Sequence, residues 1–266
     1  METQELVRKS YLSDLTDKAW DLIKSFIPHA KSSTLTGGRP EKYSKREIVN
    51  SILYIMSSGC RYADIPHDLP PGGITWKYFN RWSMSGIWRK VNMNLRRCVR
   101  VMLQRNEDPS VAIIDSQTTK ATDIALETGY DAGKKIKGRK RHLLTDTQGL
   151  LLDVRVHSAG IQDRDGAKIL LRHAKTSLAS VGKIFADGGY AGKLIAWVQK
   201  HVGSTLEIVK RSELHTFVVL PIRWIIERTN AWVSKVRRLA KDYEKKTLNQ
   251  ESMIYVRMIQ LMLRWV

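Results

Sequence analysis

The chain has 266 residues, enough for one large domain or for a medium domain and a small one. Hydrophobic residues make up 42% of it and eight residues are tryptophans, so it can bury a core and is not a disordered segment. Its 45 Lys and Arg against 26 Asp and Glu give a formal net charge of +19, which favours an anionic partner, either nucleic acid or a membrane surface. A basic structural protein of the ribosomal kind, without chemistry, is the alternative at this point.

The sequence argues against a membrane protein and for a reducing compartment. No apolar run approaches the roughly 18 to 20 residues that span a bilayer, and residues 1–15 lack the apolar centre of a signal peptide. Cys60 and Cys98 form no CxxC pair and have no histidines at zinc spacing, so buried free thiols are expected. We therefore expect a cytoplasmic, nucleoid-associated protein.

The first part of the chain predicts helices joined by short connections. A helix is expected over residues 15–27, followed by a connection rich in Ser, Thr, Gly and Lys over residues 31–43. A capping box at Ser44 begins a second helix, which Gly59 ends. A short helix around residues 62–65 follows.

A third helix is expected to begin near Thr75, and it carries basic and aromatic residues. Helices joined by short turns with such a last helix are typical of a helix-turn-helix that reads DNA. Any small helical bundle with tryptophans in its core gives a similar pattern. We interpret residues 1–105 as a small all-α, helix-turn-helix-like DNA-binding domain, with Lys77 and Arg81 as DNA contacts.

From residue 111 the pattern changes to short apolar runs that are typical of strands. Residues 111–114 predict a buried strand, and a hairpin is expected around Gln148-Gly149. The elements expected around and after this turn are strands over 141–147 and 150–157, a helix over 163–179, a strand over 182–186, a helix through 194–198, a strand over 206–211, and helices over 222–239 and from 249. This order is that of a ribonuclease H-like domain, an α/β fold with a mixed sheet and flanking helices, which we assign to residues 106–266.

Two acids follow predicted strands. Asp115 comes after the strand at 111–114, and Asp187 comes after the strand at 182–186. Ligands on open α/β sheets gather where strands end, so these two acids could face one site. Each of them could equally cap a turn or a helix.

A third acid, Glu227, lies in a polar stripe on the predicted helix over 222–239. It could form a surface ion pair with Arg223, or it could bind a metal between phosphate-binding arginines, and helical geometry does not decide between these. Chemistry favours three carboxylates in a basic protein. Two magnesium ions about 3.5–4 Å apart can activate a nucleophile and stabilise the leaving oxygen, and such hard cations prefer oxygen ligands.

Segments along nearly the whole chain resemble the bacterial insertion-sequence transposases of family five. The most specific ones are DSQTTK at 115–120, GYDAGKKIKGRKRHLLTDTQGLLLDVRVHSAGIQDRDGA at 129–167, FADGGYAG at 185–192 and LPIRWIIERTNAWVSKVRRLAKDYE at 220–244. The resemblance implies a ribonuclease H-like DDE domain with Asp115, Asp187 and Glu227 as its metal-binding catalytic acids. It also implies Mg²⁺ or Mn²⁺ as cofactor, with two ions, and the inverted-repeat ends of a mobile element as substrate.

One part of the family pattern is altered here. Members carry Tyr, Arg, Glu and Lys around the third acid, and Arg223 and Glu227 keep their places. Leu220 stands where the tyrosine would be, and Ser234 where the lysine would be, with Lys235 next to it. The acids are intact, but no role follows for Lys235.

A basic run at residues 134–141 lies between the first strand and the hairpin. It could be a solvated loop, but we favour contacts with DNA phosphates because the run adjoins the predicted site. The predicted DNA contacts are Arg223, Lys120, Lys134, Lys135, Lys137, Arg139, Lys140, Arg141, Lys77 and Arg81. Four further polar residues could assist the site or be strand-edge and helix-cap residues: His142, His157, Asp163 and Asp165.

The sequence therefore predicts a DNA transposase that uses metal ions to cut at the ends of an insertion sequence and to join those ends to target DNA. Its expected partners are double-stranded DNA, as terminal inverted repeats and target, and further copies of itself on that DNA. The alternatives are an inactive, transposase-derived DNA-binding regulator and a ribonuclease H-like nuclease that cuts without joining.

Overall fold

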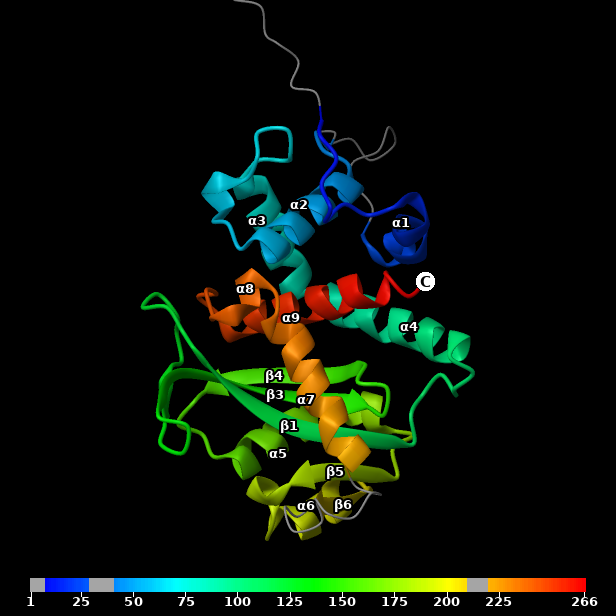
Figure 1. The fold of residues 1–266 in the computed structure, drawn as a ribbon, viewed down its shortest axis with the longest axis vertical. Coiled ribbons are helices and arrows are strands. Elements are labelled where there is room, and N and C mark those ends of the chain that lie inside the picture. The colour runs from blue at the N-terminus through cyan, green and yellow to red at the C-terminus, as the bar shows by residue number, and fades with distance from the viewer. Residues whose placement is uncertain (1–7, 29–40, 210–219) are drawn as a thin grey trace, which may run out of the picture.

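The described strands form one mixed sheet in the computed structural model, in the order β2-β3-β1-β5-β6, with β4 also paired to β3 (Figure 1). The structure describes residues 8–28, 41–209 and 220–266, with the backbone alone at 220–223. β1 pairs antiparallel with β3 and parallel with β5, which is itself parallel to β6. The strands are β1 (Val111–Lys120), β2 (Gly129–Asp131), β3 (Ile136–Asp146), β4 (Leu151–Ser158), β5 (Lys183–Asp187) and β6 (Thr205–Val209).

Helices precede this sheet and cover both of its faces (Figure 1). The helices before it are α1 (Asp17–Ile23), η1 (Lys24–Phe26), α2 (Lys45–Ser58), η2 (Tyr62–Asp64), α3 (Gly72–Met84) and α4 (Ile87–Met102). Those within and after it are α5 (Asp163–His173), η3 (Lys175–Leu178), η4 (Gly188–Tyr190), α6 (Leu194–His201), α7 (Leu220–Ser234), α8 (Arg237–Ala240) and α9 (Thr247–Met262). The fold is therefore the ribonuclease H-like mixed sheet with flanking helices that the order of elements predicted, preceded by a helical region.

Two apolar clusters lie on opposite faces of the sheet. The larger one joins the N-terminal helices to β3, β4 and α9, and includes Trp82, Trp88, Leu143, Val154 and Met258. The other lies beneath α5 and α6 and contains apolar residues of β1 and β5. Because α9 packs against both α4 and β4, the end of the chain lies between the N-terminal helices and the sheet. None of the described helices is long and apolar enough to cross a membrane.

Local sequence signals located both ends of α2 correctly. The Ser44 hydroxyl accepts a hydrogen bond from the Glu47 N–H at 3.2 Å, and Gly59 ends α2 with a φ of 74°, a conformation that glycine adopts without strain. Other predictions failed. The pattern did not reveal α4, and the helix predicted over 163–179 ends its α-helical part at His173. Cys98 is exposed rather than buried. Most of the connection predicted over 31–43 lies outside the described residues.

β1 and β5 separate just before the two acids that they carry. The two strands are paired over three positions, the last of which joins Ile113 to Phe185. Beyond that point β1 continues along β3, where Asp115 lies opposite Leu143, and β5 continues along β6. The acids thus stand at the mouth of a split between neighbouring parallel strands, a position where open α/β sheets bind ligands.

Candidate active site

Asp115 lies in the middle of β1, rather than after the end of the strand as the sequence predicted, because β1 continues to Lys120. Its carboxylate accepts a hydrogen bond from the Asn230 side-chain amide of α7 at 2.9 Å. The pKa of Asp115 is raised to about 6, mainly by burial and also by the nearby negative charge of Asp187, against hydrogen bonds from the Ser116 backbone and Asn230. The pocket therefore holds one acid, Asp115, in surroundings that disfavour its charge.

Asp187 is the last residue of β5 and is exposed. Its carboxylate accepts a hydrogen bond from the Gly189 N–H at 2.9 Å and so caps η4. The cap that the sequence offered as an alternative role is therefore present. It does not exclude a functional role, because the same carboxylate also lines a pocket.

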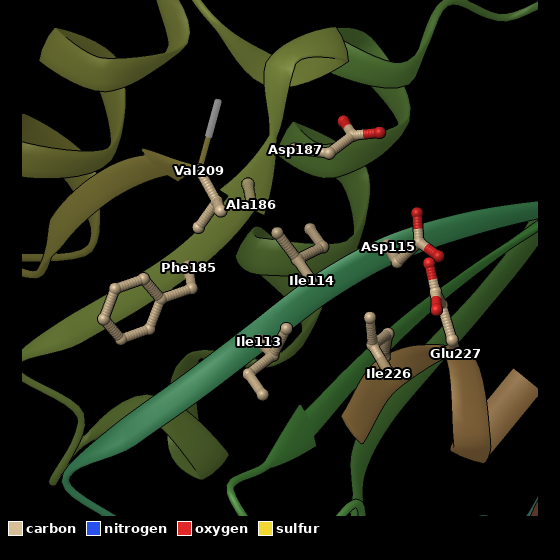
Figure 2. A pocket seen from close by; sticks show the side chains of 9 residues that line it. All are labelled: Ile113, Ile114, Asp115, Phe185, Ala186, Asp187, Val209, Ile226 and Glu227. Atoms are coloured by element: carbon tan, nitrogen blue, oxygen red, sulfur yellow. The ribbon is translucent and has the colours of Figure 1, made fainter. Parts of the chain in front are cut away.

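Glu227 reaches this pocket from α7. Asp115, Asp187 and Glu227 line it together, over an apolar floor made by Ile113, Ile114, Phe185, Ala186, Val209 and Ile226. Figure 2 shows the carboxylates of Asp115 and Glu227 turned toward each other, with Asp187 at the end of β5. Three acids that are far apart in the sequence thus meet at one pocket.

The polar stripe predicted around Glu227 includes Asn230 and Ser234, which lie on α7 and face β1. Two of its members make side-chain hydrogen bonds there: Asn230 with Asp115, and the Ser234 hydroxyl, which accepts from the Gln117 amide at 2.8 Å. The sequence suggested no function for Asn230, although its place one helical turn after Glu227 was the available signal. The side chain of Arg223 lies outside the described residues.

Three residues of the basic run do not occupy the surface position predicted for DNA contacts. Arg139, Lys140 and Arg141 lie within β3 and are buried. Arg139 pairs with Asp242 at 3.1 Å and donates to backbone carbonyls of the segment before α9. Arg141 donates to the Leu239 carbonyl at 2.9 Å. Arg139 and Arg141 hold the sheet to the C-terminal segments, and Lys140 pairs with Asp163 of α5, so the prediction is wrong for all three.

The other predicted DNA contacts are exposed where the structure describes them. Lys134 is exposed and donates to the Ser116 carbonyl at 3.0 Å, beside Asp115. Lys77 and Arg81 line a shallow groove on α3 together with Trp76 and Met84. A second groove at the far end of β1 is lined by four lysines, the last of which the sequence did not suggest: Lys120, Lys135, Lys137 and Lys241. In the described part of the chain, none of these four forms an ion pair with a carboxylate.

Comparison with known proteins assigns the chain to a family. The family model described as "Transposase DDE domain" matches residues 106–262, so the chain belongs to that family, as the resemblance predicted. A second model, described as "Putative transposase of IS4/5 family", matches residues 15–92. The chain is also similar to a protein of Burkholderia cepacia named "Insertion element IS402 uncharacterized 16.2 kDa protein". The two are 26% identical over 117 residues, which cover 43% of this chain and 78% of that protein. The chain is therefore an enzyme of the transposase type, from a family that binds DNA.

Proposed function

We propose that this protein cuts DNA at the inverted-repeat ends of an insertion sequence and joins the exposed ends to target DNA, with Asp115, Asp187 and Glu227 as its catalytic acids. One observation carries the proposal: carboxylates from β1, β5 and α7 line a single pocket in a strongly basic protein. Phosphoryl transfer needs charge neutralisation and exact placement of the reacting oxygens more than it needs covalent chemistry from the protein.

The donor set fits Mg²⁺ or Mn²⁺, since both prefer carboxylate oxygens. Among the described residues, no three His, Cys, Asp or Glu side chains gather around one point. The three acids nevertheless line one pocket, and a pair of ions about 3.5–4 Å apart would suit phosphoryl transfer there. Bound there, the ions would activate the attacking oxygen and stabilise the leaving one. Cations would also offset the unfavourable charge of Asp115, whose pKa burial raises to about 6.

The protein's own groups would orient the site. Asn230 holds one oxygen of Asp115. Glu227 and Asn230 lie on the same helix, so α7 would place the third acid and orient the first. Because α7 packs against β1, a shift of this helix would disturb both acids together.

DNA contacts are proposed for basic residues that the fold leaves exposed. Lysines around the groove at the end of β1 would neutralise backbone phosphates without reading bases, and Lys134 would do so beside Asp115. Lys77 and Arg81 on α3 would contact the terminal repeats. We keep Arg223 as a proposed contact on the sequence alone. This divides the work between a DNA-binding part, residues 1–105, and a catalytic part, residues 106–266, with further copies of the chain bringing two ends together.

The test is cleavage and joining of DNA that carries the element's own ends, with Mg²⁺ or Mn²⁺. Wild type is expected to produce joined products, whereas Asp187→Ala should bind the same DNA and produce none. The control is Asp165→Ala, which removes an exposed acid that pairs with Lys168 and does not line the pocket. Cleavage without joining would favour a plain nuclease. Binding without cleavage by the wild type would favour an inactive regulator.

A further inference from the structure

Backbone pairing leaves the spacing between Asp115 and Asp187 undetermined. The last paired position between β1 and β5 is Ile113 with Phe185, and the strands then follow different neighbours. A metal site needs its ligands held to within a few tenths of an ångström. Side chains behind the split must therefore supply the constraint that hydrogen bonds between the strands do not.

Asp163, the first residue of α5, lies behind the split and contacts β1. Its Oδ1 accepts a hydrogen bond from the Ser116 hydroxyl at 2.9 Å, and Ser116 directly follows Asp115. The same oxygen pairs with the Lys140 ammonium at 2.9 Å. Lys140 is buried and also donates to the Ile161 carbonyl at 3.0 Å, just before α5. The start of α5 is thus tied to both β1 and β3.

The second oxygen of Asp163 faces the turn that follows Asp187. A Cβ atom placed on Gly189 would lie 3.5 Å from Asp163 Oδ2 and 3.1 Å from Asp187 Oδ1, so the two acids approach this glycine together. The end of the same turn is anchored as well, because Tyr190 is buried and its hydroxyl lies 3.3 Å from His142 Nδ1 on β3. One carboxylate therefore lies between the two sides of the split, bonded to Ser116 on one side and close to Gly189 on the other.

Asp163 is suited to accept hydrogen bonds in this position. Burial alone would raise its pKa, but hydrogen bonds from Lys140 and Ser116 outweigh burial and hold the pKa below the ordinary value. Asp163 therefore stays ionised, and its Oδ1 is occupied by protein donors. This arrangement fits a group that supports metal ligands better than it fits a ligand itself.

We propose that Asp163 is a positioning residue that clamps Ser116 and the turn after Asp187, and thereby holds Asp115 and Asp187 at the spacing that divalent cations require. The inference rests on the proposed function, since it assigns those two acids to metal binding. It adds a fourth acid to the site in a role that touches neither metal nor DNA.

The test measures Mn²⁺ binding to the full chain without DNA, by electron paramagnetic resonance. Ser116→Ala is the decisive variant because it removes the hydrogen bond and no charge. Asp163→Ala removes the whole clamp, and the double variant tests whether the two act through one contact. Asp165→Ala is the matched control, since it removes an exposed carboxylate from the same turn of α5. Circular dichroism establishes that each variant is folded.

Asp187→Ala should abolish Mn²⁺ binding. Ser116→Ala and Asp163→Ala should each lower the Mn²⁺ affinity by about 10- to 100-fold, as is usual for groups that orient metal ligands. The double variant should be no weaker than Asp163→Ala, and Asp165→Ala should bind like wild type. Folded Ser116→Ala protein with wild-type affinity would overturn the clamp and leave the proposed function intact. If the wild type does not bind Mn²⁺, or binds it as well as Asp187→Ala does, the proposed metal site is wrong, and this inference fails with it.

Discussion

Replacing Asp115 by Asn should stabilise the metal-free protein at neutral pH, although it should abolish the proposed activity. Burial raises the pKa of this acid to about 6, from an ordinary value of 3.8. The folded protein therefore carries an ionised group in a position that favours the neutral form. Asparagine keeps an oxygen that can accept the hydrogen bond from Asn230 and removes the charge.

The expected size of the effect follows from the pKa. The pKa of Asp115 lies about 2 pH units above its ordinary value, and each pH unit corresponds to about 1.36 kcal/mol. Ionising Asp115 in the folded protein therefore costs about 3 kcal/mol more than in the unfolded chain. Asp115 is not fully buried, so water screens part of this energy and we expect about 2 kcal/mol. For a protein of this size the change corresponds to about 4 to 8 °C in melting temperature.

The stabilisation by Asp115→Asn should depend on pH. Well below pH 3.8 the acid is protonated in both the folded and unfolded states, so wild type and variant should be equally stable. As the pH rises from about 4 to 6, the unfolded chain ionises before the folded site does, and the wild type loses stability relative to the variant. Above about pH 6 the difference is complete.

The assay is urea denaturation with a chelator present, at pH 4.5 and at pH 7.5. The difference between the two proteins isolates Asp115 from other titrating groups. Asp187→Asn is the control, and because Asp187 is exposed we expect little change in its free energy of unfolding. A variant no more stable than wild type at pH 7.5, or an advantage that stays the same at pH 4.5, would refute the reasoning.

Three further predictions concern residues around the site. Arg139→Ala should lower the free energy of unfolding by about 3–5 kcal/mol in urea denaturation, because it leaves Asp242 buried without its partner; a loss below about 1 kcal/mol would contradict the anchoring role. Gly166→Ala should lower the free energy of unfolding by about 1–3 kcal/mol, because the new Cβ would lie 2.3 Å from His142 Nε2 and 2.4 Å from His157 Nε2. Thermal melts test this, and an unchanged melting temperature would mean that the two rings move aside. The last prediction concerns alanine substitutions of the lysines that line the groove at the end of β1, which are Lys120, Lys135, Lys137 and Lys241. In a plot of log affinity for DNA against log salt concentration, the slope should become shallower by about 0.9 for each phosphate that is no longer neutralised. An unchanged slope would mean that the groove does not contact DNA.

Local patterns in the sequence were enough to predict the class of fold and many of its elements, although not α4 or β2. Helix ends can be predicted locally because the signals act within a few residues. The Ser44 side chain bonds a free backbone N–H at the start of α2, and Gly59 adopts the left-handed conformation that ends the helix. The change from helical spacing to apolar runs located the sheet from residue 111 onward. The motifs around Asp115, Asp187 and Glu227 predicted the family, and the family model matches residues 106–262.

Burial of charge could not be predicted in this way. Arg139 resembles any other cation in a basic run, yet it lies in β3 and pairs with Asp242, 103 positions later. Lys137, two residues earlier, remains exposed. The difference depends on which distant segment packs against each residue of the strand.

The geometry of the site likewise belongs to the tertiary structure. The sequence placed acids near strand ends but not the split between β1 and β5, the orientation of Asp115 by Asn230, or the approach of Asp163 to both sides of the split. The spacing of apolar residues shows which face of a helix or strand is apolar, but it carries information about only a few neighbouring residues. The distance between two acids on separate strands depends on where pairing stops and on which side chains fill the gap, and these interactions form only when the chain is folded.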